Sequence, residues 1–415
     1  MTPTDATGRP PRVVVTGIGA VSPFGAGTCA LWSALREGKP GMTPLELFEA
    51  SGHRTGLAAV VPDSALELPE ELRAHDRHLG RTDRFALLSA WEAWQMAGLP
   101  TDDPAAACWG LFFGSSTGGM FEGENGYWRM QAAGPERTHA SDFRAQPNGS
   151  PADAVARVFS LGGPVEVLAT ACAASTMALE AALDAIRGGE VELALAGGAD
   201  GMCQTTFGGF NSLRAVDPEP ARPFREDRVG LSLGEGGAML VLETEDHAKA
   251  RGATILAVLD GAASTCDAHH MTAPHPEGDG AARAIGAALR DADMDADGIG
   301  FVNAHGSGTP HNDEAEAKAF ARVFGDGVGA LPVTSTKGAV GHMLGSCGSL
   351  EAVVTILCLR AGLVHPTPGS GRIDPAAPVD LVLGDARAVE ARSALSVNLA
   401  FGGANAALIV SRWDD

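Results

Sequence analysis

Three segments of the chain share one order of apolar and polar positions. Each begins with a short apolar run, which predicts a buried strand, and continues into a turn or loop of small residues. The segments are VEVLATACAASTMALEAAL (165–183), GFVNAHGSGTPHNDEAEA (300–317) and PVTSTKGAVGHMLGSCGSLEAVVTIL (332–357). Cys172, His305 and His342 each lie just past one of these predicted strands. Strand ends are where α/β proteins build their sites, so these three side chains are the first candidates for chemistry.

The same order of predicted elements occurs twice along the chain. Each copy begins with a helix, an Asp-containing turn, a strand and a Gly/Ser loop. A strand, a loop and a helix come next, and a further strand ends the copy. The matching segments are 86–119 with 281–309, 165–183 with 331–353, and 191–200 with 394–405. We therefore predict a duplicated α/β protein. Its two equivalent halves bring Cys172 from one half together with His305 and His342 from the other.

Cys172 lies where a predicted strand turns into an Ala/Leu-rich helix. Unpaired backbone N–H groups at a helix start carry partial positive charge, so they favour a thiolate and can hold an oxyanion. Taken alone, Cys172 could equally be an inert buried residue in a packing joint. Two histidines in the same strand-end context favour the other interpretation, because a thiol with imidazoles near it is an arrangement for nucleophilic catalysis.

Four motifs resemble the signature blocks of one family, the elongating β-ketoacyl-acyl-carrier-protein synthases of the thiolase superfamily. They are TACAAST, NAHGSGTPHND, KGAVGHMLGSCGSLEA and NLAFGGANAALIV. The resemblance runs from RVVVTGIGAVSPFG (12–25) to the last of these blocks, so it covers nearly the whole chain. It implies a thiolase-type αβαβα layered sandwich with mixed five-stranded sheets. The N-terminal half is expected over 11–250 and the C-terminal half over 251–415.

The resemblance also implies a reaction. Initiating synthases carry Asn in place of His342 and thiolases use a second Cys, so the Cys-His-His set resembles the enzymes that elongate by decarboxylation. Cys172 is expected to take an acyl group from a phosphopantetheine thioester, with the backbone N–H groups of Cys172 and Phe401 forming the oxyanion hole. His305 and His342 are expected to stabilise the enolate that forms when a malonyl extender loses CO₂.

Two charged residues match family positions that support the histidine pair. These are Lys337 and Glu351, with Asp313 and Glu316 as expected charge partners of Lys337. The alternative is an ordinary surface ion network.

The resemblance places further residues around the substrate. Thr272 and Thr309 are expected to contact phosphopantetheine or malonyl, and Phe401 to gate the acyl pocket, although Phe401 could also be a core aromatic. Where fatty-acid enzymes line this pocket with apolar residues, this chain has Thr117 and the polar segment 138–153, which contains Asp142. A polar, unsaturated or aryl-bearing chain of a type II, polyene-like polyketide pathway is therefore expected. The alternative is that segment 138–153 is a solvated loop.

Composition restricts the class of protein. With 415 residues and 45% hydrophobic content the chain can bury a large core. It has no run of 18 uncharged apolar residues and no charged-then-apolar leader after its polar start, so we expect a cytoplasmic protein without a membrane span. Seven scattered cysteines without CxxC spacing favour neither disulfides nor a metal site, and no bound cofactor is expected.

Charge bears on the partners. A formal net charge of −21 disfavours nucleic acid and anionic membranes. The expected partners are an acyl carrier protein, whose 4′-phosphopantetheine carries the substrates, and a second subunit, either an identical copy or a chain-length-factor-like protein. Carrier-protein docking is expected at Arg77, Arg81, Arg137 and Arg214, each of which could instead be solvated surface charge.

The sequence thus predicts an acyltransferase that elongates a chain held on Cys172 by condensation with malonyl-acyl-carrier-protein. One alternative is a ketosynthase-fold acyltransferase that works without decarboxylation, against which the two histidines count. The other is a non-catalytic chain-length factor, a class that generally lacks the nucleophile.

Overall fold

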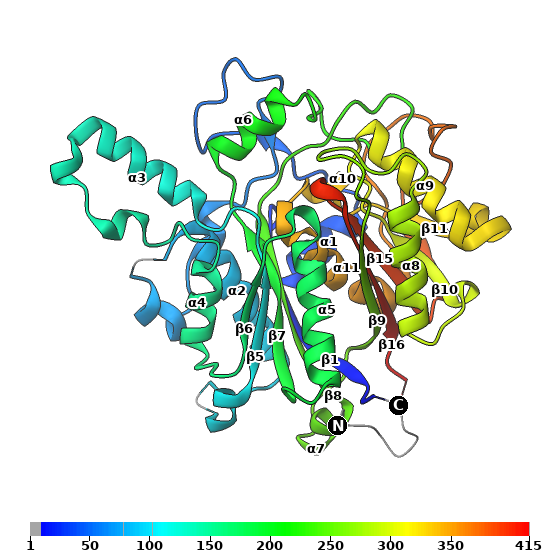
Figure 1. The fold of residues 1–415 in the computed structure, drawn as a ribbon, viewed down its shortest axis with the longest axis horizontal. Coiled ribbons are helices and arrows are strands. Elements are labelled where there is room, and N and C mark those ends of the chain that lie inside the picture. The colour runs from blue at the N-terminus through cyan, green and yellow to red at the C-terminus, as the bar shows by residue number, and fades with distance from the viewer. Residues whose placement is uncertain (1–9, 78, 102, 415) are drawn as a thin grey trace.

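The computed structural model describes residues 10–414 except residues 78 and 102, and it describes the backbone but not the side chain of Asp142. The fold is a large mixed sheet with helices packed on both sides and between its two halves (Figure 1).

Five strands of the N-terminal half lie in the order β6-β5-β7-β8-β1. The first three run parallel, and β8 and β1 pair antiparallel. Their bounds are β1 Val13–Ser22, β5 Gly110–Gly114, β6 Val165–Leu168, β7 Leu193–Asp200 and β8 Gly236–Thr244.

Five strands of the C-terminal half repeat this arrangement in the order β11-β10-β15-β16-β9, with the same parallel and antiparallel pairs. Their bounds are β9 Ala257–Cys266, β10 Ile299–Asn303, β11 Pro332–Thr334, β15 Ser393–Leu399 and β16 Ala404–Arg412. Since every strand has a counterpart at the same place in the order, the predicted duplication is confirmed.

The two halves are not separate sheets, and this differs from the sequence-based expectation. Val13–Val15 of β1 pair antiparallel with Ala257–Leu259 of β9. With the short strands β2 (Gly25–Ala26) and β13 (Asp380–Leu381), the two five-stranded units form one twelve-stranded sheet. The junction pairs backbone groups that would otherwise be left at two exposed strand edges.

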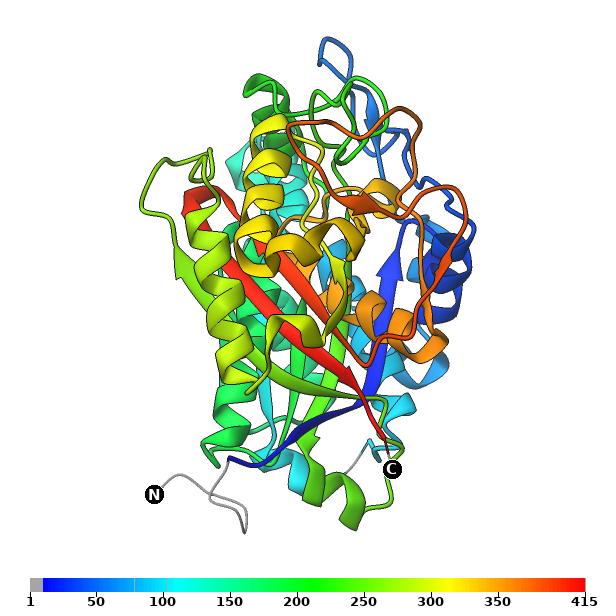
Figure 2. The ribbon, with the colours of Figure 1, turned by 90° about the vertical axis from the view of Figure 1, so that its right-hand side faces the viewer.

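Helices cover this sheet in layers. Buried residues of α5 (Ala174–Arg187) and α11 (Cys347–Ala361) share one core with both halves of the sheet, so these two helices form the central layer. Helices α2 (Arg81–Met96) and α4 (Ser150–Val158) pack on the N-terminal half, and α8 (Asp279–Asp291) and α9 (Pro310–Phe324) on the C-terminal half (Figures 1 and 2). The thiolase-type layered fold is therefore confirmed.

Other elements lie outside these layers. They are α1 Thr28–Arg36, α3 Met120–Ala133, α6 Gln204–Ser212, α7 Glu245–Ala250, α10 Lys337–Val340, β3 Thr43–Pro44, β4 Leu57–Ala58, β12 Leu363–Val364 and β14 Arg387–Ala388. Helix α3 projects from the body of the molecule (Figure 1).

One helical segment, Leu344–Ala361, is long and apolar enough to cross a membrane by length and composition alone. Most of it is buried between the two halves of the sheet, and Glu351 and Arg360 lie within it. Burial in the core accounts for its apolar character.

The close approach of β1 to α2 gives a prediction about stability. A Cβ at Gly17 would lie 1.9 Å from the carbonyl oxygen of Ala93. Gly17→Ala should therefore force the two elements apart and lower the free energy of unfolding by about 1–3 kcal/mol.

Gly286→Ala is the matched control. Gly286 lies inside α8, and a Cβ at this position would have Nη1 of Arg290 as its nearest neighbour, 3.5 Å away. This variant should be more stable by about 0.5–1 kcal/mol, because alanine favours the helix. Denaturant midpoints of both variants test the packing, and an unchanged midpoint for Gly17→Ala would contradict it.

Candidate active site

Cys172 lies in a single helical turn, Ala171–Ala173, between β6 and α5. Ala171 has a φ of 49°, in the left-handed region that residues with a Cβ seldom adopt. This turn reverses the chain at the strand end and points the thiol into the molecule, where Cys172 is 6% exposed. The abrupt strand-to-helix turn expected from the sequence is confirmed.

His305 follows β10 and His342 follows α10, and both are buried. Sγ of Cys172 and one ring nitrogen of each histidine lie within 4.8 Å of one another. The two imidazole rings meet edge to face with centroids 5.4 Å apart. The fold therefore brings together the three side chains that the sequence placed at strand ends.

Burial governs the protonation of Cys172. Desolvation raises the pKa of its thiol to about 11, although the charge of Lys337 and the backbone N–H groups of Phe401 and Cys172 act in the opposite direction. The expectation that the helix start favours a thiolate is therefore outweighed in this structure. The same two N–H groups lie within hydrogen-bonding reach of the sulfur, so they are close to the oxygen of a thioester that Sγ attacks, where an oxyanion hole needs its donors.

Both histidines are neutral. Burial, followed by the charge of Lys337, lowers the pKa of His305 well below its usual value and that of His342 to about 3. Nδ1 of His342 accepts a hydrogen bond from the backbone N–H of Leu344 at 3.1 Å. A neutral imidazole that accepts at Nδ1 carries its proton on Nε2, so His342 is a donor at Nε2.

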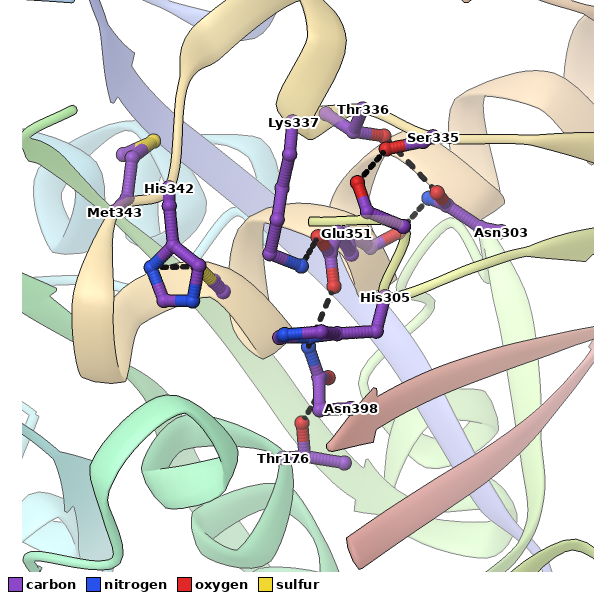
Figure 3. Close-up of polar contacts among 12 residues, drawn as sticks. Thr176, Asn303, His305, Ser335, Thr336, Lys337, His342, Met343, Glu351 and Asn398 are labelled. Atoms are coloured by element: carbon purple, nitrogen blue, oxygen red, sulfur yellow. Dashed lines mark hydrogen bonds and ion pairs between the residues drawn. The ribbon is translucent and has the colours of Figure 1, made fainter. Parts of the chain in front are cut away.

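His305 is held in the same tautomer by Asn398 (Figure 3). The amide nitrogen of Asn398 donates to the Glu351 carboxylate at 2.8 Å and lies 3.3 Å from Nδ1 of His305. Its amide oxygen accepts from the Thr176 hydroxyl, and these bonds together fix which way the amide points. Asn398 had no expected role, although it opens the NLAFGGAN motif near the end of β15.

Lys337 and Glu351 form a buried ion pair at 2.5 Å, and each side chain is 2% exposed. Burial lowers the pKa of Lys337, but the neighbouring Glu351 carboxylate raises it further, so the ammonium keeps its charge. The alternative that Lys337 and Glu351 belong to an ordinary surface ion network is therefore wrong. Lys337 connects to His305 through Glu351 and Asn398.

One of the two expected charge partners of Lys337 is wrong. Glu316 and Lys337 interact through their charges without a direct ion pair, whereas Asp313 does not pair with Lys337. Asp313 forms a buried ion pair with Arg228 at 3.2 Å. Glu316 accepts the backbone N–H groups of His305 at 2.6 Å and Gly306 at 2.8 Å, and burial raises its pKa to about 8. Both carboxyl groups therefore shape the loop that carries His305.

A cavity of about 410 Å³ leads to Cys172 and both histidines. Thr272 and Thr309 line it, as expected for groups that contact a phosphopantetheine arm. Phe401 also lines it and stacks on Phe210, with ring centroids 5.5 Å apart.

Other predicted pocket residues lie elsewhere. Thr117 does not line this cavity, because its hydroxyl is bound to the buried carboxylate of Asp200 at 2.9 Å. Segment 138–153 is also absent from the lining and contains exposed positions. The side chain of Asp142 lies outside the described residues.

The predicted docking arginines separate into two groups. Arg214 is exposed on the rim of the cavity, and Arg77 and Arg137 are exposed on the surface. Arg81 is 8% exposed and is held by Glu235 at 2.5 Å and Asp63 at 2.6 Å, so its proposed docking role is wrong. It opens α2, and the buried Glu235 carboxylate holds its guanidinium at the edge of the core.

Cys172, His305 and His342 are the one group of potential metal ligands found among the described residues. Metal ligation needs a thiolate and free imidazole lone pairs. Here the thiol pKa is about 11 and both Nδ1 atoms accept hydrogen bonds, so protons occupy the Sγ and Nε2 positions. The three groups are thus arranged as a thiol beside two N–H donors.

A buried thiol with two neutral imidazoles, set at matching loops of a duplicated αβαβα fold, defines an acyl-transfer site of the thiolase type. The chain matches the family models "Beta-ketoacyl synthase, N-terminal domain" over residues 11–248 and "Beta-ketoacyl synthase, C-terminal domain" over residues 256–370. It belongs to the β-ketoacyl synthase family.

Similar proteins come from two kinds of pathway. The chain is 36% identical to a 3-oxoacyl-[acyl-carrier-protein] synthase 2 of Coxiella burnetii over 97% of this chain and 99% of that protein. It is 38% identical to a putative polyketide beta-ketoacyl synthase 1 of Streptomyces halstedii over 96% and 98%. Among solved structures, the ishigamide ketosynthase/chain length factor has a TM-score of 0.90 at 34% identity, over 97% of this chain and 100% of that one.

The raised pKa of Cys172 predicts how its alkylation depends on pH. Because the thiol ionises only near pH 11, its rate of reaction with iodoacetamide should rise about tenfold per pH unit from pH 7 to pH 9, without a plateau. Peptide mass spectrometry distinguishes Cys172 from the exposed Cys29, Cys108 and Cys266. A plateau below pH 8 would mean that the thiolate is stabilised after all.

Proposed function

We propose that the protein is an elongating ketosynthase that joins an acyl chain held on Cys172 to a malonyl unit carried by an acyl carrier protein. The observation that carries this proposal is the pair of neutral histidines, His305 and His342, each with Nε2–H available beside the thiol. The proposal extends to the division of the chain into halves at 11–250 and 251–415, and to a cytoplasmic location.

The reaction begins with transfer of the acyl group from the phosphopantetheine sulfur to Sγ of Cys172. The thiol proton leaves with the departing phosphopantetheine thiolate, which is released as a thiol. The N–H groups of Cys172 and Phe401 stabilise the oxyanion that forms during the exchange.

The malonyl thioester then enters by the same cavity and loses CO₂. The two electrons of the broken C–C bond form an enolate, and its oxygen accepts hydrogen bonds from Nε2–H of His305 and His342. The enolate carbon attacks the acyl-Cys172 carbonyl and expels the thiolate, which takes up a proton. The product is a β-ketoacyl chain two carbons longer, on the carrier protein.

Lys337 supports this step without contacting the substrate. Its charge, together with burial, lowers the pKa of both histidines, so each remains a neutral donor and a poor acid. A protonated imidazole could instead protonate the enolate and release it as an unproductive acetyl thioester.

An acidic carrier protein is the proposed partner. Arg214 on the cavity rim lies beside the exposed apolar side chain of Leu213, which is 58% exposed. Arg77 and Arg137 are proposed as further contacts. A second subunit completes the enzyme, and a chain-length-factor-like protein is one candidate because two similar solved structures are described as ketosynthases with such a factor.

The proposed substrates are partly oxidised or polyunsaturated chains of a type II polyketide pathway. The polyketide relative and the ketosynthase/chain length factor structures support this choice over saturated fatty acids.

The alternatives differ in what they do with the site. A non-catalytic chain-length factor has no use for Cys172, and an acyltransferase without decarboxylation has no use for two enolate donors. The buried set of Cys172, His305 and His342, with a hydrogen bond at each Nδ1 and both Nε2–H groups available, favours condensation over both.

Separate assays of the two half-reactions test the mechanism. His342→Ala should slow decarboxylation of malonyl carrier protein by about 10²-fold or more, the cost of one oxyanion donor, while Cys172 is still acylated. Cys172→Ala should abolish condensation but retain CO₂ release. Equal loss of acylation and decarboxylation in His342→Ala would instead indicate a base that activates the thiol.

A competition experiment tests the pathway. Saturated and polyenoyl or β-keto carrier-protein substrates of equal length are supplied together, and Cys172 acylation and extension are measured. Discrimination of about tenfold in favour of the β-keto chain is expected, because its carbonyl oxygen accepts a hydrogen bond that an alkyl chain would leave unmade, and each buried polar group left unpaired costs about 1–3 kcal/mol. Equal rates would leave no basis for the polyketide assignment.

A further inference from the structure

A second thiol lies against one of the proposed catalytic histidines. Cys347 is the first residue of α11, five residues after His342, and is 2% exposed. Its Sγ lies 3.7 Å from Nδ1 of His342. The proposed reaction gives Cys347 no role, although the short turn Leu344–Ser346 brings it back onto the imidazole.

The protonation states of both partners permit one direction of hydrogen bonding. Burial raises the pKa of Cys347 well above its usual value, so the thiol keeps its proton. His342, with a pKa of about 3, is neutral and offers a lone pair at Nδ1. The S–H group therefore donates and the ring nitrogen accepts, alongside the N–H of Leu344 at 3.1 Å.

Two donors on Nδ1 have two physical consequences. They hold the ring at one orientation and exclude the tautomer with its proton on Nδ1. They also draw electron density out of the ring, so Nε2–H becomes a stronger donor, because hydrogen bonds in a chain polarise one another. Nε2–H is the group that faces the developing enolate in the proposed reaction.

We infer that Cys347 is a positioning residue, which orients His342 and strengthens it as a donor to the enolate oxygen. This inference rests on the proposed function. It distinguishes Cys347 from Cys172: the first acts on decarboxylation alone, and the second on acyl transfer.

Cys358 provides a matched control. It lies on the same helix, is fully buried, and belongs to the same core cluster as Cys347, without a contact to His342 among the described residues. Cys347→Ala and Cys358→Ala remove the same atom from the same helix. Loss of packing should therefore affect the two variants alike, whereas loss of the donor affects only the first.

The experiment measures CO₂ release from malonyl carrier protein in a Cys172→Ala background, and acylation in the presence of Cys172. Cys347→Ala should slow decarboxylation by about threefold to tenfold, the scale of one neutral hydrogen bond, with acylation unchanged. Cys347→Ser keeps a donor and should recover most of the rate. Cys358→Ala should decarboxylate at the rate of the background protein.

Each other outcome has a defined meaning. Decarboxylation by Cys347→Ala at the rate of Cys358→Ala, or equal loss of acylation, would overturn the inference. If Cys347→Ala fails to fold, Cys347→Val fills the space without a donor, and full activity of this variant would also overturn it. If the Cys172→Ala protein, with Cys347 and Cys358 intact, releases no CO₂, the proposed function itself is wrong.

Discussion

The burial of Cys172 and its neighbours is the condition on which the rest of the site depends. Burial drives the Cys172 thiol, the two imidazoles and the Glu351 carboxyl group toward their neutral forms. Two of these changes serve the chemistry directly, because neutral His305 and His342 donate where charge will develop. The same desolvation disfavours the thiolate of Cys172, so acylation has to draw on the oxyanion hole, Lys337 and the arriving thioester. The same buried environment thus favours decarboxylation of the malonyl unit and makes acylation of Cys172 more difficult.

A buried site between two halves of one chain requires a rigid frame, and the duplication supplies it. Helices α5 and α11 occupy equivalent places in the two halves and pack against each other between the two parts of the sheet. Cys172 is placed by the start of α5, and the His342 loop by the start of α11. A hydrogen bond from the Thr176 hydroxyl on α5 to Asn398 connects the same frame to His305. The pairing of β1 with β9 continues the sheet across the junction, so the loops of both halves are attached to one continuous sheet.

Sequence patterns were enough to identify the parts that depend on local order. Cys172, His305 and His342 follow apolar runs, and strand ends converge in any fold of this kind, so their meeting could be predicted. The partners of charged residues could not be predicted, because they depend on burial and on segments that lie far apart in the chain. Arg81 meets Glu235 across 154 positions, and Asp313 meets Arg228 rather than Lys337. The partner of the Thr117 hydroxyl could not be predicted either, because Asp200 comes from another strand end.

Electrostatics explains how an acidic enzyme can receive an acidic partner. With a net charge of −21 spread over the whole chain, long-range repulsion is expected but is screened beyond about 8–10 Å at physiological ionic strength. What remains at contact distance is the local surface. Around the cavity mouth this surface offers the guanidinium of Arg214 together with exposed Leu213 and Val229, and Met271, 76% exposed, lies next to the lining residue Thr272. Apolar area contributes affinity that salt does not screen, while a single arginine contributes orientation. At the proposed docking rim, selection among carrier proteins is therefore expected to depend on local shape more than on the total charge of either protein.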